Sequence, residues 1–283
     1  MRIFTGVHMK KLIAGTVLAL LSGTVFAFDQ STISPNGGVS SYTKTDYIIT
    51  SKFGDYFRSP SVKYVHMFNT NGLETECISY SAKDVLIDRI MYDYDTSRNL
   101  VSSRFYNASD ELQWKTQVEY DSTGKIKEEA EYDASGRLTA KTIYRYNGRE
   151  TSESLYNGEG ALLSRTIKKT NELNRLVEVN KYFDDGSLDV QEVYGYADNG
   201  HLVQVEYFDA HKECTGKTIF RYDSAGVLTE EQQLNATKLL VARKIYKSDS
   251  MGNPTKVSLY SVAEKFGSIA NELQGITEYS YKY

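Results

Sequence analysis

The sequence contains few of the residues that enzymes and metal sites depend on, with only two cysteines, four histidines and one tryptophan in 283 residues. His66, His201 and His211 are scattered and lack the paired spacing of a metal site, so each is expected to be an ordinary surface or strand residue. A nucleophile elbow, a phosphate-binding loop and a conspicuous carboxylate pair are also missing. We therefore expect no enzyme, with no catalytic residue, no metal and no cofactor.

Long hydrophobic runs are missing after the first residues, and no later segment is apolar enough to span a bilayer as a helix. Residues 1–27 have the pattern of a cleaved export signal: Met9, Lys10 and Lys11 are followed by an apolar core over 12–21 and a small-residue cleavage site ending at Ala27. A membrane anchor is the alternative, but the apolar run is short. No cysteine follows this core, which argues against a lipid anchor. We expect a protein of the periplasm, the cell surface or the medium.

Positive charge is also scarce. The whole chain carries a formal net charge of −4, and removal of residues 1–27 takes away three basic residues, leaving about −7. A net negative surface disfavours binding to nucleic acid or to an anionic membrane. We expect neither as a partner.

What the sequence does contain is a repeat. Anchor residues alternate at spacings of 12 and 14, with a single spacing of 10, and thirteen of the sixteen are aromatic. The anchors are Phe68, Tyr80, Tyr94, Tyr106, Tyr120, Tyr132, Tyr146, Tyr156, Thr170, Tyr182, Tyr196, Phe208, Tyr222, Leu234, Ser248 and Tyr260. Asp or Asn follows the anchor in twelve of fifteen intervals. A period of about 26 residues indicates a tandem array of structural units.

Each unit has the pattern of an antiparallel hairpin, because Asp followed three residues later by Gly is typical of a type I turn. The turn from Asp133 to Gly136 would place Tyr132 opposite Leu138, Ala130 opposite Ala140, and Glu129 opposite Lys141. The preceding turn would place Trp114 opposite Tyr132 and Lys115 opposite Glu131. The aspartates of these turns could be mistaken for calcium ligands, but bonding to their own backbone is the simpler expectation.

Every anchor spacing is even, which predicts that the anchors share one face of the sheet. We expect the possible binding surface on that face and along its aromatic neighbours. Its candidate residues are Tyr94, Tyr106, Trp114, Tyr120, Tyr132, Tyr144, Tyr182, Tyr194, Tyr196 and Tyr222.

The segments from Gly216 to Thr229 and from Tyr132 to Thr139 resemble the Tyr-Asp (YD, or RHS) repeat of bacterial surface and secreted proteins. The resemblance covers roughly residues 80–254. It implies a long antiparallel sheet that spirals or wraps into a shell, and a role in envelope contacts or encapsulation. The chain is too short to enclose a toxin and lacks the terminal processing region of the large members. MORN-like or YwqK-like hairpin arrays are a neighbouring resemblance, although they usually contain more glycine.

The predicted fold is therefore all-β: a tandem antiparallel hairpin array forming a long twisted or spiralling meander, with a small C-terminal helix. We expect a linker and N-terminal cap over 28–67, the repeats over 68–260, and a helix-and-strand cap over 261–283. The helix is expected over 262–273 because Val262, Phe266, Ile269 and Leu273 have helical spacing. A last strand is expected over 276–283.

Two cysteines in an exported chain suggest a disulfide. Cys77 and Cys214 would lie in the first and twelfth strands of the array, roughly 50 Å apart in an open sheet at about 4.8 Å per strand. A disulfide needs Cα atoms within about 7 Å. We expect both to be unpaired.

Three functional classes remain. The first is a non-enzymatic exported repeat protein whose sheet is a scaffold or binding surface for a protein or glycan in the envelope. The second is a glycan- or cell-wall-binding array, suggested by the run from Tyr182 to Gly186, although such arrays rely on tryptophan and Trp114 is the only one. The third is an outer-membrane β-barrel, for which charged residues on the apolar face and the short strands are unfavourable.

Overall fold

The computed structural model describes residues 33–52, 55–265 and 268–283, and they form one antiparallel sheet. Its strands are β1 (Ser41–Lys52), β2 (Asp55–Phe68), β3 (Glu74–Ser81), β4 (Leu86–Tyr94), β5 (Leu100–Asn107), β6 (Leu112–Tyr120), β7 (Ile126–Asp133), β8 (Leu138–Asn147), β9 (Glu150–Asn157), β10 (Leu162–Thr170), β11 (Leu176–Phe183), β12 (Leu188–Tyr196), β13 (Leu202–Phe208), β14 (Cys214–Tyr222), β15 (Leu228–Asn235), β16 (Leu240–Ser248), β17 (Pro254–Lys265) and β18 (Ser268–Lys282).

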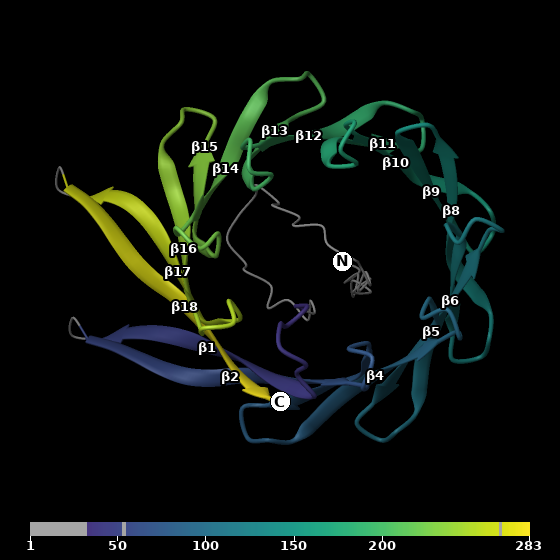
Figure 1. Ribbon diagram of the computed structural model, residues 1–283, viewed down its shortest axis with the longest axis horizontal. Helices are drawn as coiled ribbons and strands as arrows, with labels where there is room; N and C mark the ends of the chain where they lie inside the picture. The colour runs from purple at the N-terminus through teal and green to yellow at the C-terminus, as the bar shows by residue number, and fades with distance from the viewer. Residues whose placement is uncertain (1–32, 53–54, 266–267) are drawn as a thin grey trace, which may run out of the picture.

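The sheet closes on itself. Each strand pairs with the next along the chain, and β1 also pairs with β18, from Ser41 opposite Lys282 to Ile48 opposite Gly275. Figure 1 shows the resulting ring. The prediction of an all-β antiparallel meander is confirmed, and its open or spiralling form is corrected to a closed 18-stranded barrel. Closure removes the unpaired strand edges that an open sheet would expose.

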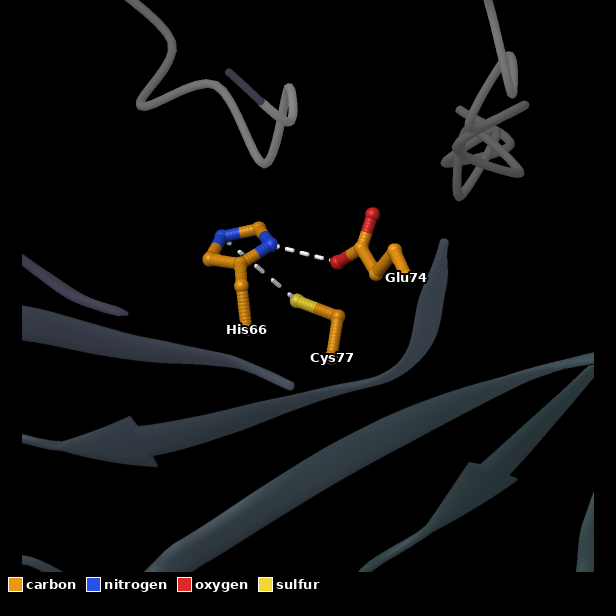
Figure 2. A group of neighbouring side chains, drawn as sticks. All are labelled: His66, Glu74 and Cys77. Atoms are coloured by element: carbon orange, nitrogen blue, oxygen red, sulfur yellow. Dashed lines mark hydrogen bonds and ion pairs between the residues drawn. The ribbon is translucent and has the colours of Figure 1, made fainter. Parts of the chain in front are cut away.

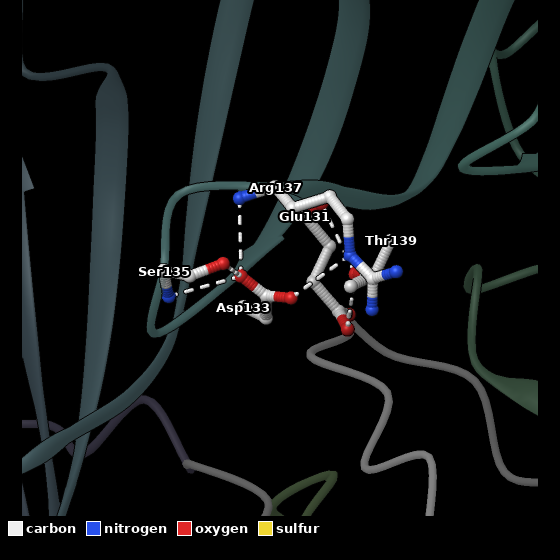
Figure 3. Close-up of polar contacts among 5 residues, drawn as sticks. All are labelled: Glu131, Asp133, Ser135, Arg137 and Thr139. Carbon is white, nitrogen blue, oxygen red and sulfur yellow. Dashed lines mark hydrogen bonds and ion pairs between the residues drawn. The ribbon is translucent and has the colours of Figure 1, made fainter.

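The turns follow the predicted chemistry. In Figure 3 the Asp133 carboxylate accepts hydrogen bonds from the backbone N–H groups of Ser135 and Arg137, each at 3.0 Å, and from the Ser135 hydroxyl at 2.6 Å. The N–H of Gly136 bonds to the Asp133 carbonyl at 3.0 Å, and Gly136 has a φ of 84°. Glycine adopts this left-handed conformation without steric cost. These aspartates therefore serve the turn, as expected.

The predicted register holds only beside each turn. Tyr132 lies opposite Leu138 as predicted, but the register then shifts between Glu131 and Tyr132, so Ala130 faces Lys141 and Glu129 faces Thr142. Across the preceding turn, Lys115 faces Tyr132, and Trp114 faces Asp133. The cause is a β-bulge next to each of these two turns, where two residues of one strand oppose one residue of its partner. Pairing predictions that ignored the bulge were wrong by one residue.

The bulges also decide which side chains point into the ring. In Figure 2, His66 and Cys77 point inward from neighbouring strands, and they are direct partners in the register. Partners in an antiparallel ladder share a face, so the inner face can be followed from strand to strand through eighteen pairings. The path passes Phe105 and Trp114, crosses from β18 to β1 at Asp46, and returns to His66 through Tyr42. The two walls are therefore assigned consistently around the whole barrel.

This assignment overturns the prediction that all anchors share one face. The anchors in the eight-residue strands β5, β7 and β11 are Tyr106, Tyr132 and Tyr182. They point outward, because the residue before each of them points inward. The anchors Tyr120 and Tyr196, in the nine-residue strands β6 and β12, lie on the inner wall. The reason is that Val118 and Tyr194, two residues earlier, point inward. Even spacing keeps residues on one face only where the alternation is unbroken, and most hairpins contain a one-residue register shift, although β8–β9 does not.

Both predicted caps are strands. Residues 41–52 and 55–68 of the expected N-terminal cap are β1 and β2, while residues 28–32 and the export signal lie outside the described residues. The expected helix over 262–273 is replaced by β17 and β18, whose pairs include Val262 with Asn271 and Tyr260 with Leu273. Helical spacing of four apolar residues was outweighed by the ladder hydrogen bonds that a hairpin provides. Phe266 itself lies outside the described residues.

Candidate functional site

The inner wall combines aromatic rings with carboxylates. Tyr144, Tyr194 and Tyr246 donate hydrogen bonds to Glu129, Glu192 and Glu231 at 3.2, 2.5 and 2.6 Å. Lysines neutralise part of this charge, with Nζ to carboxylate distances of 2.6 Å for Lys168 and Glu153 and 2.9 Å for Lys181 and Glu192. Burial is the main cause that raises the pKa of Glu129 and of Tyr144. The wall is thus polar, preorganised and rich in flat aromatic surfaces.

Seven of the ten predicted binding residues point inward, and three point outward. Tyr94, Trp114, Tyr120, Tyr144, Tyr194, Tyr196 and Tyr222 are on the inner wall, whereas Tyr106, Tyr132 and Tyr182 are on the outer wall. The structure therefore does not gather them into one surface.

Several of the inward tyrosines have a structural role. Tyr94, Tyr120, Tyr196 and Tyr222 each donate a hydrogen bond at 2.8–2.9 Å to a backbone carbonyl twenty residues earlier. Each bond ties the end of one strand to the start of the strand immediately before it, with which it pairs. We call these four contacts the tyrosine rungs.

A compact cluster of His66, Glu74 and Cys77 also lies on the inner wall (Figure 2). His66 comes from β2, and Glu74 and Cys77 come from β3 across the turn at residues 69–73. His66 Nδ1 is 2.6 Å from a Glu74 carboxylate oxygen, and His66 Nε2 is 3.8 Å from Cys77 Sγ. The His66 ring stacks on Tyr42 with centroids 4.4 Å apart. Each of the three cluster residues is at least nine-tenths buried.

The chemistry of this cluster is limited by burial. Burial first, and then the charges of Glu74 and Asp88, raise the pKa of the Cys77 thiol well above its usual range. The order thiol, imidazole, carboxylate resembles that of a nucleophile, its base and the group that orients the base. However, the thiol is held protonated, and His66 is 0% exposed, so no substrate can reach it in this conformation. Within the described residues, these three donors are the group that could hold a metal ion, with ligand atoms within 4.8 Å of one another.

The sequence interpretation missed this cluster because it examined histidine spacing alone. His66 is a strand residue, as expected, but it is fully buried rather than at the surface. The available signal was the turn after Phe68, since a hairpin centred there places His66 directly opposite Cys77. Cys214 lies in β14, eleven strands further along the ring from β3, and is exposed.

Two hairpins extend beyond the ring. Figure 1 shows β1–β2 and β17–β18 projecting from the same side of the barrel and diverging from one another. The β1–β18 ladder ends at Ile48, while β1 continues to pair with β2 as far as Lys52. Large apolar side chains are exposed here, with Ile48 at 50%, Phe57 at 55% and Ile269 at 74%. These tips are a second surface available for contact.

Among the described residues, we find no helix with the length and apolarity needed to cross a membrane.

Comparisons with known proteins find only distant structural matches. No protein-family model matches the chain, and no curated protein matches it. A porin-like protein from Bacteroides uniformis is 12% identical, with a TM-score of 0.46 over 88% of this chain and 99% of that one. A TcdB2–TccC3–TEV structure is 11% identical with a TM-score of 0.19, and the match spans 17% of that chain. A Bacteroides fragilis protein with unknown function is 12% identical with a TM-score of 0.15. No family is established by these matches, and the YD-repeat resemblance stays a prediction.

Proposed function

We propose that this chain is a non-enzymatic, exported barrel that works in water, in the bacterial envelope or outside the cell, and binds a protein or glycan partner. The observation that carries the proposal is the charge on the outer wall. A barrel that spans a bilayer presents an apolar band about 25 Å tall to lipid, and an outward lysine or arginine at mid-depth costs about 2–4 kcal/mol.

The outer wall has a basic residue on nearly every second strand, directly opposite an anchor of the following strand. The basic residues are Lys63, Arg89, Lys115, Lys141, Arg165, Lys217 and Arg243, and their opposite anchors are Tyr80, Tyr106, Tyr132, Tyr156, Tyr182, Leu234 and Tyr260. We call this set the outer basic row.

Carboxylates lie beside the outer basic row. Lys141 Nζ is 3.6 Å from Glu128 Oε2, and Arg243 Nη2 is 2.6 Å from Glu230 Oε1. Aromatic rings also contact the outer basic row, since Lys115 Nζ lies 5.1 Å from the centroid of the Tyr132 ring. Such cation–ring contacts and ion pairs are compatible with water. A lipid-facing wall would have to desolvate all of these charges.

The test is fractionation of cells that make the native protein, with carbonate extraction and a comparison of boiled and unboiled samples on a gel. We expect recovery in the periplasm or the medium and no heat-dependent mobility change. Recovery in carbonate-resistant membranes with a mobility change would contradict the proposal.

That contrary result would favour an outer-membrane barrel, the second candidate. Closure and the even strand number support it, since membrane barrels of bacteria share both. The strands from β3 to β16 have seven to ten residues, whereas about 9–11 are needed to span a bilayer.

A third candidate is glycan binding on the outer wall. A hollow of about 350 Å³ is lined by Arg165, Tyr182, Phe183 and Asp185 among others, and Phe183 is 49% exposed. An aromatic ring beside carboxylates suits the apolar and hydroxyl faces of a sugar. On a glycan array, Phe183→Ala should abolish glycan binding. Leu239→Ala, a substitution in the equivalent turn between β15 and β16, should leave glycan binding unchanged. Equal signals from both variants would exclude the hollow.

A further inference from the structure

We propose that His66 and Cys77 bind a zinc-class divalent metal ion on the inner wall, with Glu74 orienting His66. This inference is independent of the partner proposed above. It rests on three observations about the same cluster: the donor separation, the hydrogen bond on the far side of the imidazole, and the packing that fixes the ring.

The donor separation matches a shared metal. Zinc binds thiolate sulfur at about 2.3 Å and imidazole nitrogen at about 2.0–2.1 Å, so two such donors at a tetrahedral centre lie about 3.6 Å apart. Cys77 Sγ and His66 Nε2 are 3.8 Å apart. An ion can therefore be placed between them with little movement of either side chain.

The hydrogen bond to Glu74 leaves the correct nitrogen available. With its oxygen 2.6 Å from His66 Nδ1, the Glu74 carboxylate accepts the Nδ1 proton and so directs the lone pair of Nε2 toward Cys77. A carboxylate behind a ligating histidine fixes its tautomer and raises its basicity, and its loss typically weakens metal binding about 10–100-fold.

Packing holds the site in shape. The Tyr42 ring lies almost parallel to that of His66, at an interplanar angle of 18°, and the Tyr42 hydroxyl accepts the N–H of Ile33 at 3.0 Å. Asp88 faces Ser79, the next inward position after Cys77, and is itself buried. On binding, the Cys77 thiol releases its proton to solvent and a metal–sulfur bond forms.

The experiment uses the full mature chain, reduced and stripped of metal with a chelator, then titrated with Zn²⁺ and separately with Co²⁺. We expect a single tight site per chain and a thiolate-to-cobalt charge-transfer band in the near ultraviolet. Cys77→Ser and His66→Gln should abolish both signals, and Glu74→Gln should weaken zinc binding about 10–100-fold. Cys214→Ser is the matched control, because it removes an exposed thiol and should change neither signal.

The unmodified chain gives a readout that does not depend on whether a variant folds. Zn²⁺ should raise its thermal midpoint and should slow alkylation of Cys77 in partly denaturing conditions, while alkylation of Cys214 is unchanged. Absence of stoichiometric zinc binding to the unmodified chain, or a cobalt band that survives Cys77→Ser, would overturn the proposal.

Discussion

At the scale of single residues, the left-handed position that closes each turn determines how much strain a hairpin carries. Glycine occupies it at Gly124, Gly136 and Gly226, but Arg98 and Lys212 adopt the same conformation at φ values of 70° and 62°. A side chain with a Cβ pays a steric cost there of about 1–2 kcal/mol. The sequence repeat is thus imperfect at the positions where glycine is most useful.

We predict that Arg98→Gly raises the free energy of unfolding by about 1 kcal/mol, measured by urea denaturation, because it removes this steric cost. Ser97→Gly, one residue earlier in the same turn, is the control and should give no gain. Equal effects from the two substitutions would mean that the left-handed backbone is not the source of the strain.

Turn carboxylates predict a pH dependence. Hydrogen bonds from Ser135 first, and then from Arg137, lower the pKa of Asp133 to about 2, against an unfolded value of about 3.9. A lowered folded pKa means that the contribution to stability is present above the unfolded pKa and is lost as pH falls from about 4 to about 2. Asn107 and Asn157 occupy the equivalent turn position.

The change to make is Asp133→Asn, because asparagine keeps the acceptor oxygen and removes the titration. We expect this variant to lose less stability than the unmodified chain between pH 4 and pH 2, measured by thermal unfolding across that range. Asn157→Asp should do the reverse. Parallel pH curves for all three proteins would refute the assignment.

At the scale of elements, the tyrosine rungs connect neighbouring strands. We predict that Tyr196→Phe lowers the free energy of unfolding by about 1 kcal/mol, because the Leu176 carbonyl loses the hydroxyl that lies 2.8 Å away. Tyr182→Phe removes the same group from the outer wall and should cost less in the same denaturation experiment. A larger loss for Tyr182→Phe would show that the rungs do not stabilise the barrel.

Elements also show what the sequence can and cannot predict. The turn after Tyr132 and the strands around it follow from Asp133 and Gly136, because local hydrogen bonds determine them. The face on which each side chain lies does not follow in this way, because a bulge beside most turns shifts the register by one residue without leaving a distinct sequence signal. The His66 cluster needed the correct pairing of β2 with β3, and the expected helix at Val262 failed because a partner strand was available.

At the scale of the whole molecule, closure is the property that the repeat alone did not determine. A hairpin array can spiral or close according to the twist and stagger accumulated over all its strands. The deciding contact joins the two ends of the chain, where Thr43 lies opposite Ser280 and Lys44 opposite Tyr279. Closure also separates an inner wall from an outer wall: the proposed metal site lies on the inner wall, and the charge that carries the proposed function lies on the outer wall.

The most direct test of this account is a disulfide across the closing seam, formed in the double variant Thr43→Cys and Ser280→Cys with Cys214 replaced by serine. Ser102→Cys with Gln117→Cys, a register pair within one hairpin, is the positive control, and Thr43→Cys with Ser154→Cys, on strands far apart in the ring, is the negative control. Mild oxidation should join the seam pair as readily as the hairpin pair, giving a faster band on a non-reducing gel. A hairpin pair that oxidises while the seam pair remains reduced would show that the sheet is open and would contradict the closed barrel.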